Sequence, residues 1–129
     1  MLSTHVRNLR YKYPVILSTL LALNGCDGNT SGSGAQWFKG GTLHGATAGD
    51  WLRATDANRL ATSADFCASI MRSKKPYNGD MDRLRRDAEW LNKNITDAAT
   101  GASADEQVAD ICGMIMAVAE QTHAGPYSE

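Results

Sequence analysis

The residues of this chain with the widest chemical use are three cysteines and three histidines: Cys26, Cys67, Cys112, His5, His44 and His123. A metal site needs such side chains at short spacings, as in Cys-x-x-Cys or His-x-x-x-His, and the sequence contains neither pattern. It also lacks a phosphate-binding loop and a Gly-x-Ser-x-Gly nucleophile motif. Its carboxylates lie mainly at predicted helix starts and on exposed faces, where capping and solvation account for them. The sequence therefore predicts no catalytic residue, no metal ligand and no cofactor, and we expect a non-enzymatic protein.

Any functional residues must be positioned by a single small domain. The 129 residues allow one domain, or one small domain with a tail. The 13 Lys and Arg residues nearly balance the 14 Asp and Glu residues, whereas a nucleic-acid-binding protein usually has a strong basic excess. At 43% hydrophobic residues, the chain is not globally disordered. These totals argue against a large enzyme and against a nucleic-acid partner.

The N-terminus has the pattern of an export signal. Three basic residues and no acidic residue precede an apolar run at 15–23. A membrane-spanning helix needs about 20 apolar residues, whereas the apolar part of a signal peptide has roughly 7–15. We therefore predict that residues 1–25 are a signal peptide.

The predicted signal ends in Leu23-Asn24-Gly25-Cys26, which resembles the lipobox of bacterial lipoproteins. Leu23 supplies the aliphatic residue three positions before the cysteine, and Gly25 supplies the small residue directly before it. The resemblance implies that Cys26 is the diacylglyceryl-modified first residue of the mature chain. The protein would then be anchored in the inner or outer membrane of the cell envelope and face the periplasm. The alternatives are cleavage by an ordinary signal peptidase, followed by secretion, and a chance apolar stretch in a cytosolic protein.

Residues 26–40 follow as a lipid-anchored, flexible tether, because 27–36 consist mainly of Gly, Ser, Asn and Thr. Without the three basic residues of the signal, the mature chain has 10 basic and 14 acidic residues, a net charge of −4. Besides Cys26 it keeps one pair of cysteines. In an oxidising compartment an even pair indicates a disulfide, so we predict a bond between Cys67 and Cys112. Two buried free thiols are the alternative.

Residues 41–125 have the periodicity of an all-α domain. Apolar residues recur at helical spacing in three stretches, 48–72, 80–101 and 103–125. The last stretch is apolar on several sides, which predicts that it is the central and most buried helix. We expect three or four helices around one core, followed by a short tail at 126–129.

Capping residues predict where these helices start. Thr47 and Asp80 are the expected N-caps of the first and second stretches, and Ser103-x-x-Glu106 is a capping box for the third. The first stretch forms either one helix or two helices with a break near Thr55.

Two polar clusters on the predicted helices could contact a partner. Asn58, Thr62 and Asp65 share one helix face through their i, i+4, i+7 spacing and could bind a partner or a small ligand, unless they form a solvent face. A basic cluster around the turn between the first two stretches could meet anionic headgroups, a glycan or an acidic protein. A solvated helix face is the alternative for this cluster too. Its members are Arg72, Lys74, Lys75, Arg83, Arg85 and Arg86.

The expected function combines an anchor with a binding domain. The stretch 42–66, which includes Thr42-Leu43-His44 and Trp51, is also similar to small bacterial exported proteins, a resemblance that implies no particular activity. We expect a membrane-anchored lipoprotein that acts as a non-enzymatic interaction module, with the bilayer and an envelope protein as its partners. The alternative is a stress-protective, chaperone-like helical protein of the periplasm. A module binds one stoichiometric partner, whereas a chaperone protects many clients.

Overall fold

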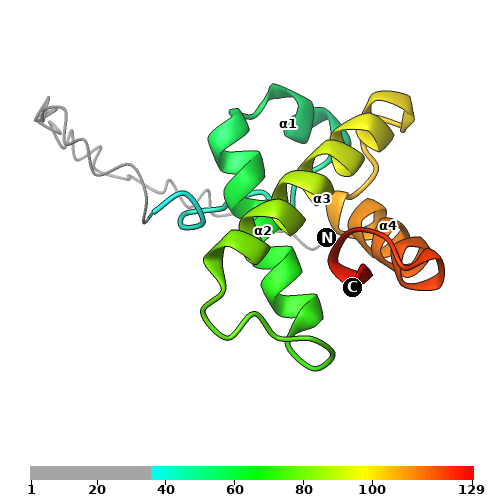
Figure 1. The fold of residues 1–129 in the computed structure, drawn as a ribbon. Helices are drawn as coiled ribbons and strands as arrows, with labels where there is room; N and C mark the ends of the chain where they lie inside the picture. Colours follow the sequence, from blue (N-terminus) through cyan, green and yellow to red (C-terminus); the bar gives the residue numbers. More distant parts are fainter. Residues whose placement is uncertain (1–35) are drawn as a thin grey trace, which may run out of the picture.

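The computed structural model describes residues 36–129, and its regular elements are helices (Figure 1). In chain order they are α1 (Ala48–Arg53), α2 (Asp56–Met71), α3 (Met81–Gly101), α4 (Val108–Thr122) and a final 3-10 turn, η1 (Gly125–Tyr127). The described residues form no strand beyond one isolated bridge, and the helices enclose one hydrophobic core. The predicted all-α fold is confirmed, whereas the predicted signal peptide lies outside the described residues.

The central helix is α3, because α1, α2, α4 and η1 all pack against it (Figure 1). Its buried stripe keeps the predicted helical spacing and consists of Leu84, Ala88, Leu91 and Ile95. The prediction that the last helix is central is wrong. Helix α4 lies at the edge of the bundle, where Met114 and Val118 remain 57% and 59% exposed.

Side-chain caps start the first three helices. Thr47 accepts a hydrogen bond from the Asp50 N–H, and the Asp50 carboxylate accepts from the N–H and hydroxyl of Thr47, so α1 has a complete capping box. Thr55 caps α2, which resolves the first predicted stretch into two helices. Asp80 caps α3 as predicted.

The predicted capping box of the last helix is wrong. Helix α4 begins at Val108 after Gln107, which makes no side-chain cap. Ser103 instead donates its hydroxyl hydrogen to the Asp105 carboxylate. The reason is a tertiary contact, because the backbone of this loop is held against the start of α1.

Residues 46–49 and 104–108 pair through their backbones in what we call the loop clamp. The N–H of Ala48 donates to the Glu106 carbonyl (2.7 Å), and the N–H of Val108 donates to a carbonyl of the first segment (2.9 Å). The first N–H group of α1 and that of α4 have no acceptor within their own helices. In the loop clamp, a carbonyl of the opposite segment accepts each of them.

The folded domain extends beyond the predicted bounds of 41–125 at both ends. Trp37 and Phe38 pack against the core, and the Arg85 guanidinium lies 4.9 Å from the centre of the Trp37 ring. At the other end Pro126 is buried and Tyr127 packs against the core. The last residues of the predicted tether and the first two residues of the predicted tail therefore belong to the domain.

Candidate functional site

An open apolar groove lies between α3 and α4. Its volume is about 530 Å³, and small-molecule sites span roughly 300–1,000 Å³. Both helices contribute residues at helical spacing, and the loop between them closes one end. We call this feature the α3–α4 groove; its main lining residues are Trp90, Asn94, Ala98, Gly101, Ala102, Glu106, Ile111, Met114, Ile115, Val118, Ala119 and Thr122.

Small side chains keep the groove open. Ala98, Gly101 and Ala102 form much of its α3 wall, where larger residues would fill the space. Met114 and Val118 lie one helical turn apart along α4, and each is more than half exposed. A contiguous apolar surface of this kind marks an interaction site far more often than isolated exposed apolar residues do.

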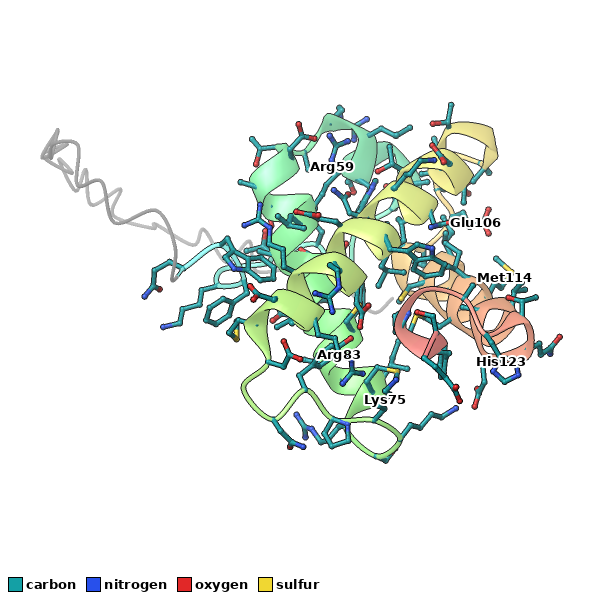
Figure 2. The ribbon with its side chains drawn as sticks, in the orientation of Figure 1. Arg59, Lys75, Arg83, Glu106, Met114 and His123 are labelled. Atoms are coloured by element: carbon teal, nitrogen blue, oxygen red, sulfur yellow. The ribbon has the colours of Figure 1, made fainter. Side chains whose placement is uncertain are left out.

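The polar groups of the groove are largely held by its own backbone. The Asn94 amide donates to the Trp90 carbonyl (2.7 Å), and the Thr122 hydroxyl donates to the Val118 carbonyl (2.9 Å). Among the described lining residues Glu106 alone carries a charge. Figure 2 shows it on the same side of the molecule as Met114 of α4. This arrangement suits the binding of an apolar surface and pairs no acid with a base.

The predicted polar face of α2 is occupied by the chain itself. The side-chain oxygen Oδ1 of Asn58 accepts the N–H of Thr42 (3.0 Å), and the side-chain Nδ2 of Asn58 donates to the Thr42 hydroxyl (2.8 Å). The Thr62 hydroxyl accepts the N–H of Leu43 (3.2 Å). The Asp65 carboxylate contacts His44, the next residue of the same segment. The spacing did predict a binding face, but the segment that it binds is residues 42–44 of the same chain.

The two described histidines have structural roles. His44 Nε2 is 3.1 Å from Asp65 Oδ2, and the His44 ring packs edge-on against Phe66. His123 follows α4 in a left-handed conformation, with φ of 53°. Within residues 36–129, no group of three or more His, Cys, Asp or Glu residues gathers as a metal ion requires.

Part of the predicted basic cluster is neutralised within the fold. Lys74, in the turn after α2, pairs with Glu120 of α4, and this hydrogen bond raises the pKa of Lys74. Arg85 pairs with a glutamate one turn further along α3 (2.7 Å). Arg72 and Arg86 have no acidic partner within 4 Å among the described residues. Lys74, Arg83 and Arg85 therefore have acidic partners and the other three members have none within residues 36–129, so half of the cluster is neutralised, which weakens the prediction of a contact patch.

Arg83 closes the turn between α2 and α3 rather than facing outward (Figure 2). Its guanidinium donates to the carbonyls of Lys75 (2.8 Å) and Pro76 (3.2 Å) and lies 4.4 Å from the centre of the Tyr77 ring. The Tyr77 hydroxyl donates to the buried Asp87 carboxylate (2.8 Å). Burial raises the pKa of Tyr77, so this hydroxyl stays a donor.

Cys67 of α2 and Cys112 of α4 lie in the same core as free thiols. They are 0% and 1% exposed, and burial raises the pKa of each thiol to about 12. For Cys67, the negative charge of Asp87 adds to this rise, and Cys112 is close enough to contribute as well. The disulfide stays a prediction for the protein in an oxidising compartment.

Cys26 lies outside the described residues, so its lipidation stays a prediction. Among residues 36–129, no helix has both the length and the apolar character needed to cross a membrane. No family model, no curated protein and no solved structure matches the chain. The candidate site therefore rests on the geometry of the α3–α4 groove.

The sequence pattern did not identify this groove, although it carries a signal for an exposed apolar face. The apolar residues Met114 and Val118 made the last helix apolar on several sides. We interpreted that pattern as burial on all sides. A helix at the edge of a bundle has the same pattern when one of its apolar faces lacks an internal partner.

Proposed function

We propose that this chain is a lipoprotein of the bacterial cell envelope whose helical domain binds a partner protein without catalysing a reaction. The lipobox resemblance at Cys26 supports the anchor, and the composition of residues 27–36 supports a tether with a span of roughly 15–20 Å. The observation that carries the binding role is the α3–α4 groove with its exposed Met114 and Val118.

Covering this groove would favour association. Complete burial of an apolar side chain contributes about 1.5–3 kcal/mol, and more than half of Met114 and of Val118 is still available for burial. These two side chains together supply about 2 kcal/mol before the rest of the groove is counted. A few such residues at the centre of an interface usually carry most of its binding free energy.

The anchor is tested by the intact mass of the protein extracted from the membrane fraction. We expect a chain that begins at Cys26, carries a diacylglyceryl group and lacks two hydrogens because Cys67 and Cys112 are bonded. A mass that includes residues 1–25 would refute the export and anchor proposals.

The binding role is tested by a photoreactive amino acid in place of Val118 in cells that express the chain. A matched control carries the same amino acid in place of Asp82, which is exposed at the start of α3. We expect one dominant adduct from position 118 and none from position 82. Many adducts that increase in acid would favour the chaperone-like alternative, and equal labelling from both positions would refute a role for the groove.

A further inference from the structure

The charges of this chain are divided along its sequence. All 13 Lys and Arg residues lie at or before Lys93. Beyond it, six acidic residues and no Lys or Arg occur. This part of the chain includes the second half of α3 and all of α4, so it supplies every lining residue of the α3–α4 groove except Trp90.

Three of these carboxylates lie within residues 105–110, in the loop that closes one end of the groove and in the first turn of α4 that follows it. Glu106 lines the groove, Asp105 precedes it, and Asp110 lies in the first turn of α4. Asp110, Met114 and Val118 follow one another at i, i+4 and i+8, so they share one ridge of α4. We call Asp105, Glu106 and Asp110 the acidic rim.

The acidic rim makes no ion pair among the described residues. Within residues 36–129, none of its three carboxylates lies within 4 Å of a Lys or Arg nitrogen. Ser103 donates a hydrogen bond to Asp105 and lowers the pKa of that carboxyl group. The groove therefore combines an apolar wall with unneutralised negative charge at one end.

The length of the groove matches one face of a short helix. Residues 90–102 of α3 and 111–122 of α4 line it, and at 1.5 Å per residue these walls are about 17–18 Å long. A helix whose apolar residues recur at i, i+4, i+7 and i+11 presents an apolar face of about the same length. Laying such a face into a groove between two helices is a common form of recognition.

We propose that the α3–α4 groove binds an amphipathic helix of another protein that carries Lys or Arg residues beside its apolar face, with these cations lying over the acidic rim. The inference rests on the proposed function and names the class of partner. Charge complementarity favours this occupant over the alternatives. Two copies of the chain joined through their grooves would bring two acidic rims into one interface, and an anionic lipid headgroup would be repelled.

The probe is a synthetic helix-forming peptide of about 18 residues with Leu at i, i+4, i+7 and i+11 and Lys at flanking positions. A control peptide keeps every Leu and carries Glu in place of each Lys. Both are titrated calorimetrically into the full protein extracted from membranes. We expect the Lys peptide to bind about tenfold more tightly than the Glu peptide at low salt. This difference should shrink when the salt rises from about 20 mM to about 500 mM, because added salt screens exposed charges.

Three variants locate the binding. Val118→Glu, at a position already 59% exposed, should weaken binding of the Lys peptide about tenfold without unfolding the protein. The combined change Asp105→Asn, Glu106→Gln and Asp110→Asn should remove the preference for Lys over Glu. Asp82→Asn, on the same scaffold but away from the groove, should alter neither affinity nor preference.

Equal affinity for the two peptides, or binding that Val118→Glu leaves unchanged, would overturn the inference. So would concentration-dependent dimerisation that the Lys peptide does not reverse, because the occupant would then be a second copy. If neither peptide binds while the photoreactive amino acid at position 118 still labels one envelope protein, the basic-helix inference is refuted and the proposed binding role stands. If the Lys peptide binds but the intact mass shows no lipid on the protein, the basic-helix inference is supported and the proposed lipid anchor is refuted.

Discussion

Replacement of Gly41 with alanine tests the close approach of residues 42–44 to α2. A Cβ atom at Gly41 would lie 2.6 Å from the Thr62 nitrogen and 2.9 Å from the Ala61 carbonyl carbon. Ordinary contacts between such atoms are about 3.5–4 Å long. The obstructing atoms belong to a helix backbone, so no side-chain rotation relieves the clash. The segment must therefore move away from α2 by about 1 Å.

This movement would break two hydrogen bonds that hold the segment. The bonds from the N–H of Leu43 to Thr62 (3.2 Å) and from the N–H of Thr42 to Asn58 (3.0 Å) would both exceed hydrogen-bonding distance. Each contributes about 1 kcal/mol, so their loss costs about 2 kcal/mol. Replacing a glycine with alanine also lowers the conformational entropy of the unfolded chain, which by itself stabilises the folded protein by about 0.4–1 kcal/mol.

The matched control is Gly45→Ala, because a Cβ atom at Gly45 meets no atom within 4 Å. The effect of alanine on the unfolded chain is the same in both variants. The difference between their free energies of unfolding therefore reports the contact with α2. We expect urea unfolding, followed by circular dichroism, to show that Gly41→Ala is less stable than Gly45→Ala by about 2 kcal/mol. The Leu43 amide should also exchange its hydrogen faster in Gly41→Ala. Two variants within about 0.5 kcal/mol of each other, with equal exchange, would refute the described contact.

Three further predictions concern titratable groups. Tyr77→Phe leaves the buried Asp87 carboxylate without its hydroxyl donor and should cost about 1–3 kcal/mol in urea unfolding; an unchanged midpoint would contradict the 2.8 Å hydrogen bond. In the reduced, folded protein, Cys67 and Cys112 should react with a thiol reagent at pH 8 only as fast as the protein opens, because burial raises the pKa of each to about 12. Rapid labelling of both in the native state would show that they are accessible. Hydrogen bonds from Thr47 lower the pKa of Asp50, so its contribution to stability is complete above the ordinary value of 3.8 and is lost as the pH falls through the lower native value. Asp50→Asn should accordingly flatten the acid side of the stability curve, and an unchanged pH dependence would exclude this role.

The helices themselves were predictable from the sequence because they depend on local patterns. The apolar stripe from Leu84 to Ile95 and the caps at Thr47 and Asp80 need only the period of a helix and a side chain that can accept the first free N–H groups. These signals lie within a few residues of the structure that they specify. No knowledge of the remaining chain is needed to interpret them.

The arrangement of the helices was not predictable in the same way. Ser103 and Glu106 have the spacing of a capping box, but the loop clamp holds this backbone against a segment that lies more than 50 residues earlier. The candidate site has the same limit. The exposure of Met114 depends on which helix occupies the centre, and the 21-residue α3 contacts every other helix there.

The loop clamp also sets the order in which the domain can be completed. Thr47 and Gln107 face each other across a sequence separation of 60 residues, so this closure waits until most of the chain has been made. The six-residue α1 is too short to persist without such contacts. A chain cut before Ala104 should therefore destabilise α1 as well, because it lacks the two carbonyls that accept the N–H groups of Ala48 and Gly49. During synthesis or export, the first helix of this domain would gain these contacts only when the loop that precedes the last helix arrives.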